Sequence, residues 1–269
     1  MFVSQQGGRL SMVRQDQHML QTGALAAGWD RGWFIDEAER QILVEAMSLH
    51  DAGWREADDE VLYDEQAGRP VNFTGVGFTR HSAFYRSGYE LALSSSDGAG
   101  LLVGMHWIGL YNARFGIEPA LNFPVAEELR PRQRELIAAN EQEWVLVRQR
   151  MWSPEHPLSD FEDRIWRQYE VFQLLDRISI AVCMNDLGVP KTVQVGPVRL
   201  GGGRERTPVE VSIVGDGRVA LEPFPFDREF SAPVARSFIP DQRYASHDEL
   251  RDAVTSAADD PIVCEVVAR

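Results

Sequence analysis

The sequence contains almost no lysine, few cysteines and no long hydrophobic run. Lys191 is the single lysine among 27 basic residues, so arginine carries nearly all the positive charge. The two cysteines, Cys183 and Cys264, lie far apart and outside any CxxC or Cys-His spacing. No apolar stretch approaches the roughly 18 residues of a spanning helix, and the first residues lack the basic and apolar regions of a signal peptide. We therefore expect a cytoplasmic protein that is neither secreted nor membrane-spanning.

Acidic residues dominate the charge of the chain. The formal net charge is −14 and the isoelectric point is about 4.9. Contacts with nucleic acid or with an anionic membrane depend on a basic surface, so we expect neither as the main partner. A hydrophobic content of 44% over 269 residues is enough for a sizeable core. The expected partner is a small-molecule substrate, and the composition is compatible with a homo-oligomer.

Hydrophobic periodicity predicts a mainly α-helical protein with a β-rich end. Residues 2–14 read as a short hairpin around a glycine pair, and helical patterns follow, interrupted by a long Gly-, Pro- and Asp-rich loop over residues 52–80. Later segments alternate polar and apolar residues between Gly-rich turns, with a short helix near 248–257. We expect a helical domain with its hairpin over residues 1–190 and a β-rich α+β subdomain over residues 191–269.

Six side chains of the kinds that bind metals lie in or beside apolar, helix-compatible segments. Burying such groups costs several kcal/mol unless each finds a partner or a metal, and Asp176 inside PheGlnLeuLeuAspArgIleSerIleAla is the clearest case. Imidazoles and carboxylates without thiolate suit Fe, Mn, Zn or Ni and argue against a structural zinc site. The candidate ligands are His18, His50, Asp51, His81, His106 and Asp176.

Each candidate ligand also has a plainer interpretation on its own. Asp176 could pair with a buried arginine, His106 could be a core histidine bonded to a backbone carbonyl, and His81 could cap a helix. The adjacent His50 and Asp51 are about 100° apart on a helix, so both face one pocket only at a helix end or between two metals. A bridging Asp51 would satisfy that geometry.

The order of these residues resembles the HD-domain superfamily, and within it the dinuclear-metal branch, over roughly residues 12–187. The segment GlnAspGlnHisMetLeuGlnThrGlyAlaLeuAla is similar to the first-helix motif of HD-type mixed-valent diiron oxygenases, which cleave organophosphonates and related small molecules. HisAspAlaGlyTrp, GlyArgProValAsnPhe and MetHisTrpIleGlyLeuTyr resemble one bacterial family catalogued as a domain of unknown function. The resemblance implies an HD-like helical core and two metal ions bridged by Asp51, iron first, with Mn, Ni or Zn as alternatives.

Trp54 departs from the superfamily pattern. Many members carry a basic residue just after HisAspXaaGly, where it can serve a phosphate, so Trp54 weakens a phosphate role. Nearby arginines could supply bidentate contacts instead, or could be solvated surface residues. We predict a substrate pocket lined by Trp54, Asp58, Arg69, Asn72, Arg86 and Trp107. Other aromatic residues could shield it from water: Trp29, Trp33, Phe73, Phe78, Phe84 and Tyr85.

These residues favour an enzyme, with Asp51, Arg80 and Tyr85 as candidate catalytic residues. The first hypothesis is a dinuclear iron oxygenase of the HD type that acts on a small polar organic substrate and dioxygen. The alternative is a metal-dependent phosphohydrolase, in which two metals polarise a phosphoryl group and lower the pKa of bound water. The third is a non-enzymatic metal or ligand sensor that signals through residues 191–269. Trp54 and the scarcity of lysine favour the oxygenase.

Overall fold

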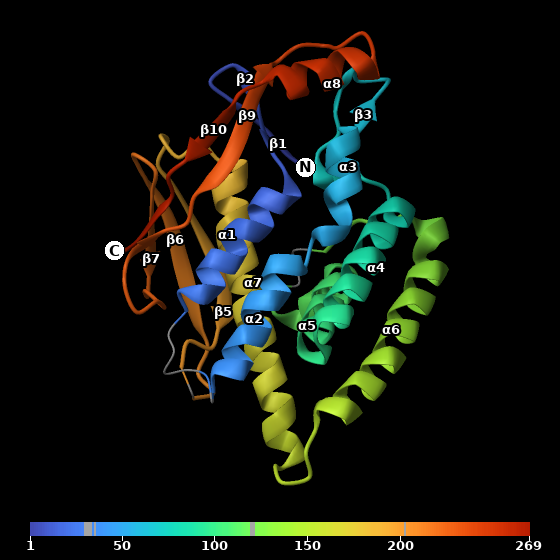
Figure 1. Ribbon diagram of the computed structural model, residues 1–269, viewed down its shortest axis with the longest axis vertical. Coiled ribbons are helices and arrows are strands. Elements are labelled where there is room, and N and C mark those ends of the chain that lie inside the picture. The colour runs from blue at the N-terminus through green and yellow to red at the C-terminus, as the bar shows by residue number, and fades with distance from the viewer. Residues whose placement is uncertain (30–33, 35, 119–121, 202) are drawn as a thin grey trace.

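The computed structural model describes residues 1–269 except 30–33, 35, 119–121 and 202, and the described part is a mixed α+β fold (Figure 1). Its helices are α1 (Gln15–Ala27), α2 (Glu37–Leu49), α3 (Arg55–Glu60), α4 (Phe78–Ser95), α5 (Asp97–Tyr111), α6 (Arg130–Met151), α7 (Leu158–Met184) and α8 (His247–Ser256). Short 3-10 turns are η2 (Ala52–Trp54), η3 (Phe73–Gly75), η4 (Ala113–Gly116) and η5 (Glu127–Leu129). The predicted mixture of helices and strands is confirmed, although strands make up more of the fold than a mainly α protein would have.

Two sheets and one small hairpin account for the strands. The first sheet has the antiparallel order β1 (Phe2–Gln6), β2 (Arg9–Val13), β9 (Val234–Pro240) and β10 (Asp259–Ile262). The second has the order β5 (Lys191–Val198), β6 (Thr207–Gly215), β7 (Arg218–Glu222), β11 (Glu265–Ala268) and β8 (Phe230–Ser231), with β7 and β11 parallel. The small hairpin pairs β3 (Tyr63–Asp64) with β4 (Arg69–Pro70). The predicted N-terminal hairpin and β-rich C-terminal part are therefore confirmed.

The first sheet joins the two ends of the chain. Arg9 pairs with Pro240 and Met12 pairs with Ser237, so β2 lies beside β9. The predicted division between residues 1–190 and 191–269 thus runs through a sheet that both parts build. Whether the two parts fold as separate units stays a prediction.

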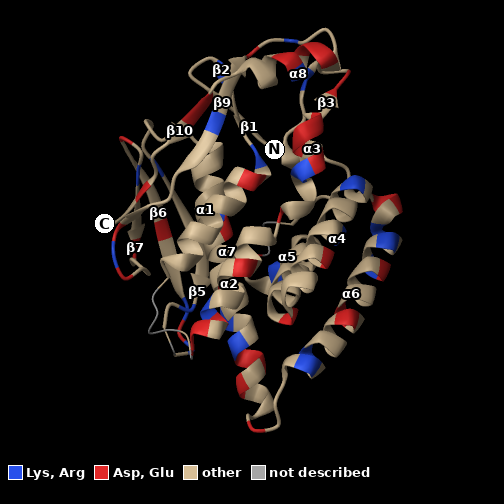
Figure 2. Ribbon diagram, viewed as in Figure 1, with Lys and Arg blue, Asp and Glu red and all other residues tan. Residues whose placement is uncertain are grey.

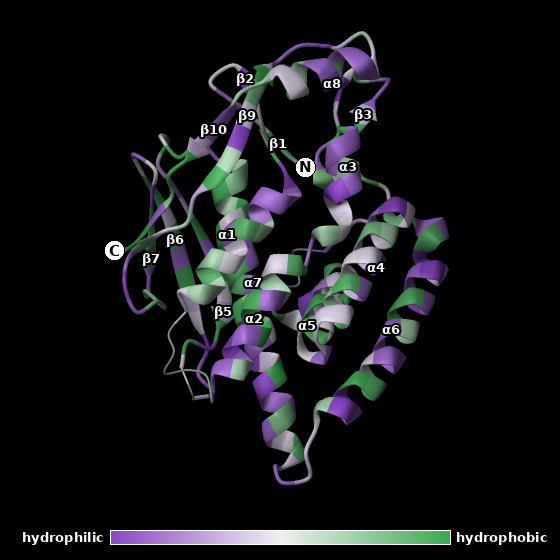
Figure 3. Ribbon diagram, in the orientation of Figure 1, coloured by the Kyte–Doolittle hydropathy of each residue, from purple (hydrophilic) through white to green (hydrophobic). Residues whose placement is uncertain are grey.

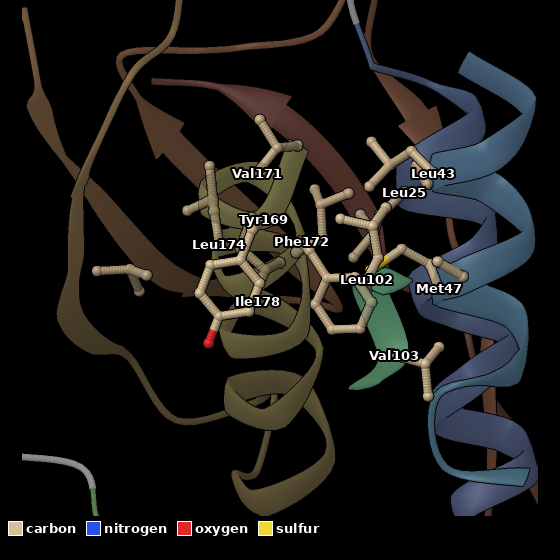
Figure 4. Packing of buried hydrophobic residues seen from close by; sticks show 14 of the residues in the cluster. Leu25, Leu43, Met47, Leu102, Val103, Tyr169, Val171, Phe172, Leu174 and Ile178 are labelled. Atoms are coloured by element: carbon tan, nitrogen blue, oxygen red, sulfur yellow. The ribbon is translucent and has the colours of Figure 1, made fainter. Parts of the chain in front are cut away.

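One hydrophobic core links the helices that carry the predicted ligands. α7 contacts α1, α2 and α5, and Figure 4 shows Phe172 of α7 directed toward Leu25, Met47 and Leu102 from those three helices. α5 is apolar around its whole circumference and buried along its length, as expected of a helix with neighbours on every side. The helices that carry the predicted ligands therefore surround one interior.

Charge is distributed unevenly between α6 and α5. The long helix α6, at the edge of the molecule, carries arginines toward both ends and glutamates between them, whereas α5 has only Asp97 as a charged residue, at its first turn (Figures 2 and 3). Among the described residues, no helix is both long enough and apolar enough to cross a lipid bilayer.

The prediction of a long loop over residues 52–80 is wrong in detail. It contains η2, α3, the β3–β4 hairpin, η3 and the start of α4 at Phe78 rather than at His81. These elements are too short to produce a hydrophobic period, so the Gly, Pro and Asp residues dominated the prediction. Asp36 caps α2 by accepting a hydrogen bond from the Glu39 amide.

Gly53 allows α4 to pack directly on the turn that follows His50-Asp51. A Cβ atom at Gly53 would lie 1.8 Å from the Phe84 carbonyl oxygen and 2.9 Å from the Gly88 nitrogen, so only glycine fits. We expect Gly53→Ala to lower the free energy of unfolding by about 1–3 kcal/mol through overpacking. The matched control Gly77→Ala, where a Cβ would meet nothing within 4 Å, should cost under about 1 kcal/mol. Equal urea-unfolding midpoints for the two variants would contradict this explanation.

Candidate metal centre

Five helix segments bring the predicted ligands into the interior. α1 contributes His18, the end of α2 contributes His50 and Asp51, α4 contributes His81, α5 contributes His106 and α7 contributes Asp176. The exposed fractions of these residues are at most 5%: His18 0%, His50 0%, Asp51 5%, His81 2%, His106 1% and Asp176 2%. Groups this polar are rarely buried without partners, so their hydrogen bonds decide what the cluster can do.

Three ligand atoms converge on one point. His18 Nε2 lies 3.1 Å from His50 Nε2 and 3.1 Å from Asp176 Oδ1, and His50 Nε2 lies 3.7 Å from Asp176 Oδ1. Two ligands about 2.1 Å from a common cation, at angles of about 90–110°, are about 3.0–3.4 Å apart. Two of the three spacings lie in this range, and the 3.7 Å spacing corresponds to an angle of about 124°, so the three atoms can surround a single metal ion.

Asp51 stands beside this group as a fourth ligand. Its Oδ2 is 3.7 Å from His50 Nε2, and ligand atoms of His18, His50 and Asp51 all lie within 4.8 Å of one another. Within the described part of the chain, Asp51 Oδ1 and Asp176 Oδ2 are buried without a hydrogen-bond partner, and the Arg114 guanidinium lies 3.6 Å from Asp176 Oδ2. Buried carboxylate oxygens without donors are costly, and a metal ion would satisfy them.

The far edge of the His18 ring is held by a chain of hydrogen bonds. Gln21 Nε2 donates to the Ala232 carbonyl (2.7 Å), and Ser179 Oγ donates to Gln21 Oε1 (2.7 Å). The Ser179 oxygen is then left to accept from His18 Nδ1–H at 2.7 Å. This arrangement assigns the His18 proton to Nδ1 and turns the Nε2 lone pair toward the cluster, as in metal-ligating histidines.

His50 has the same polarity. Its Nδ1 lies 2.8 Å from the Met47 carbonyl oxygen, which can only accept, so Nδ1 carries the proton and Nε2 carries a lone pair. The two imidazole lone pairs and the Asp176 carboxylate therefore face one another with no donor between them. One positive charge must lie among them, either a proton or a metal ion.

The pKa values of these groups reflect that need. Burial opposes a charged His18, but the hydrogen bonds and charges of Asp176 and Cys183 together outweigh it and raise the pKa of His18 to about 10. The pKa of Asp176 is lowered despite burial, chiefly by its hydrogen bond to His18 and the charges of His106 and Arg114. Burial lowers the pKa of His50, which stays neutral. In the absence of a metal, a proton on His18 would thus bind the cluster together.

His81 and Tyr85 lie on the α4 side of the cluster. His81 Nδ1 is 2.6 Å from the Tyr111 hydroxyl, its ring stacks on Phe123, and burial lowers its pKa to about 3. Tyr85 lies between the rings of His81 and His106, with centroids 4.8 and 5.8 Å away. Burial and the neighbouring Asp51 carboxylate raise the pKa of Tyr85, so it remains a protonated phenol. Both residues therefore present neutral groups to the centre.

The two tryptophans predicted for the substrate pocket lie in different surroundings. Trp54 is buried and meets His81 edge to face, with centroids 5.4 Å apart, so it borders the cluster. Trp107 is fully buried next to His106 in the chain and packs on Tyr89. Trp33 lies outside the described residues. Phe2, which the sequence did not mark, contacts the His18 ring at 5.0 Å.

The predicted polar pocket residues, and the candidate catalytic residue Arg80, have other partners. Arg69 pairs with Asp241, Arg80 with Glu60, and Arg86 with Glu90 and Glu143, and all three arginine side chains are 43–49% exposed. Asp58 is buried against the Met1 amino group at 2.6 Å, and Asn72 accepts from the Val3 amide. The structure therefore does not gather these five residues around the histidines. Arg80 instead lines a surface hollow of about 360 Å³.

Several polar residues at the centre were missed by sequence reasoning. Gln173 and Ser179 stand three residues before and after Asp176 on α7, and Gln21 stands three residues after His18 on α1. Residues three apart share a helix face, so polar side chains at this spacing in an apolar helix were the available signal. Arg114 gave no such signal, because it follows α5 in an irregular turn.

The chain matches the family model described as "Protein of unknown function (DUF3891)" over residues 1–241 and belongs to that family. The matched region includes all six predicted ligands. No curated protein and no solved structure matches the chain. The predicted membership of a family of unknown function is thereby confirmed.

Ser179 should matter for metal affinity although it is not a ligand. We expect Ser179→Ala to weaken metal binding about 10–100-fold, because His18 loses the acceptor that fixes its tautomer. Ser82→Ala is the matched control, since the Ser82 hydroxyl donates to the Thr79 carbonyl within α4. Calorimetric titration of both variants would check this; equal affinities would contradict the proposed tautomer.

The stability of the metal-free protein should fall at alkaline pH. The pKa of His18 rises from 6.5 to about 10 on folding, so its contribution to stability is complete below pH 6.5 and lost as pH rises through about 10. A bound metal replaces that proton and removes this dependence. Urea unfolding between pH 6.5 and 10, with chelator and with added metal, would measure both curves. Parallel curves would show that His18 does not hold the proton.

Proposed function

We propose that this DUF3891 member is a non-haem metalloenzyme, with iron as its metal and oxidation of a small polar organic substrate as its reaction. The observation that carries the proposal is the group of His18 Nε2, His50 Nε2 and Asp176 Oδ1 within 3.1–3.7 Å of one another. Two histidines and one carboxylate with open positions are typical of non-haem ferrous oxygenases. A ferrous ion held in this way would supply electrons to dioxygen, the oxidant of the proposed reaction.

The donor set supports a catalytic rather than a structural metal. A structural zinc site is usually closed by four ligands that include thiolates, whereas this cluster is made of imidazole nitrogens and carboxylate oxygens. Cys183, the nearest cysteine in the chain, has its Sγ 3.9 Å from the Ser179 hydroxyl, on the far side of the hydrogen bond that holds His18. The group therefore favours Fe, with Mn, Ni or Zn as competitors.

The residues around the group would keep a reactive centre dry. The rings of Phe2 and Phe172 contact His18 and His50 at 5.0 and 5.4 Å, and Trp54 borders His81. Excluding water strengthens electrostatic contacts and prevents side reactions. Asp51, with one oxygen toward His50, would orient the centre and accept a proton from a substrate.

A second metal is the further part of the resemblance to the HD superfamily. It would require Asp51 as a bridge, with His81 and His106 as additional ligands. The HD-like helical core and the oxygenase chemistry are parts of this proposal, and the dinuclear count is the superfamily's alternative to a single ion. Phosphate-ester hydrolysis at the same centre is the competing reaction, and the buried guanidinium of Arg114, 3.6 Å from Asp176, is the feature that favours it.

The proposal is tested by metal content and oxygen consumption. Protein purified without oxygen should contain iron, and it should consume dioxygen with a member of a panel of small polar compounds that includes organophosphonates. His50→Ala and Asp176→Asn should lose the iron, while His156→Ala, in an exposed turn, should keep it.

Three results would contradict this function. Failure of the wild-type protein to bind iron would remove the metal centre, and iron retained by His50→Ala would place it elsewhere. Release of phosphate from a phosphoester panel under anaerobic conditions, with no oxygen uptake on any compound, would assign hydrolysis in its place.

A further inference from the structure

We propose that His106 is not a metal ligand but a fixed hydrogen-bond donor whose Nε2–H serves an oxygen atom of the substrate. The inference rests on the proposed metal centre and differs from the six-ligand set that the resemblance implies. It follows from the direction of each hydrogen bond around the three histidines of the cluster interior.

The Arg114 guanidinium fixes the orientation of the Gln173 amide. The guanidinium of Arg114 can only donate, and it bonds Gln173 Oε1. The amide oxygen therefore faces Arg114, and the amide nitrogen faces His106. All three side chains are buried, with exposed fractions of 1–5%, so water does not compete for these bonds.

The Gln173 amide in turn determines which ring nitrogen of His106 carries the proton. Gln173 Nε2 lies 3.2 Å from His106 Nδ1 and can only donate, so Nδ1 is the acceptor. An imidazole whose Nδ1 accepts a hydrogen bond carries its proton on Nε2. Neither nitrogen of His106 is then available to a metal, because one is engaged by Gln173 and the other is protonated.

His18 and His50 have the opposite polarity. Their Nδ1 atoms face the Ser179 hydroxyl, whose proton goes to Gln21, and the Met47 carbonyl, so both Nδ1 atoms donate and both Nε2 atoms are free. The histidines of the interior are thus sorted by their outer partners into two ligands and one donor. Such outer partners commonly determine which ring nitrogen binds a metal.

The backbone that places Arg114 is strained. Ala113, Arg114 and Phe115 have φ angles of 50°, 48° and 53°, in the left-handed region that residues with a Cβ rarely occupy. Phe115 packs against Trp144, Trp166 and Tyr169, which holds the turn in this conformation. Strain of this kind persists where the surroundings impose it and is concentrated at functional sites. Here it delivers the guanidinium that orients Gln173.

The count of metal ions follows from this assignment. Of the six predicted ligands, only Asp51 and His81 would remain for a second ion without His106, so we expect one ion per chain. The His106 ring lies 5.3 Å from the His50 ring and 5.8 Å from the Tyr85 ring, next to the proposed metal centre. Its Nε2–H is therefore a donor for an oxygen-bearing substrate group, such as a carbonyl or an oxyanion.

Zinc titration is the first test, because zinc is diamagnetic and serves as a probe of binding alone. The wild-type protein should bind one zinc ion per chain. His106→Gln should change its affinity less than about threefold, whereas His50→Gln should weaken it at least 100-fold, the upper end of effects at a ligand's supporting shell. Two ions per wild-type chain, or equal losses in the two variants, would overturn the proposal.

The Gln173→Glu variant should reverse the tautomer of His106. A carboxylate accepts from both Arg114 and His106 Nδ1–H, which bares Nε2, so the number of zinc ions should rise from one to two per chain. Gln173→Met, which neither donates nor accepts strongly, is the matched control and should remain at one. An unchanged count of one in Gln173→Glu would contradict the assignment.

The tautomer can also be read without any metal. Nitrogen-15 NMR of histidine-labelled wild-type protein distinguishes protonated from bare ring nitrogens, and we expect His106 to carry its proton on Nε2 with or without zinc. A bare Nε2 on His106 would overturn the inference. If zinc failed to bind at all, the proposed metal centre would fail, and so would the substrate role of His106 beside it, while the spectrum would still report the tautomer.

Discussion

The interior of this protein depends on three hydrogen-bond acceptors that point at one another. His18 Nε2, His50 Nε2 and Asp176 Oδ1 come from three different helices and meet with no donor between them. Such a group is repulsive unless a cation joins it, so the packing of α1, α2 and α7 is coupled to a charge at their meeting point. The apolar core around Phe172 brings the three helices together. A cation at their meeting point offsets the repulsion between the buried acceptors.

The polarity of this centre is set from outside. Each imidazole has its direction chosen by a group that does not reach the centre: a hydroxyl on α7 for His18, a carbonyl on α2 for His50 and an amide on α7 for His106. Helix α7 therefore contributes Asp176 directly and orients two of the three rings. The β-rich part contributes as well. The Ala232 carbonyl accepts a hydrogen bond from the Gln21 amide, and Gln21 Oε1 accepts one from the Ser179 hydroxyl.

The sequence predicted which titratable residues lie in the interior more reliably than it predicted their surroundings. His50-Asp51 and Asp176 could be recognised because charged groups inside apolar helices need partners, and that argument requires no tertiary structure. The arginines 69, 80 and 86 were misplaced because their position beside the ligands in the chain does not say which way a side chain points. On α4, Arg80 faces solvent while the next residue, His81, is buried. Arg114 could not be found, since its place depends on a left-handed turn that its residue types disfavour.

The pairing of β2 with β9 and the reach of Ala232 to Gln21 have a consequence for how the protein is made. Gln21 and Ala232 are separated by 211 positions, so the ribosome releases the first roughly 10–40 s before the second at about 5–20 residues per second. During that interval the nascent chain holds His18 without the support that orients its ring. At the proposed metal centre, selection of the ion therefore depends on the complete chain. An ion that bound earlier would meet ligands whose rings are less well oriented.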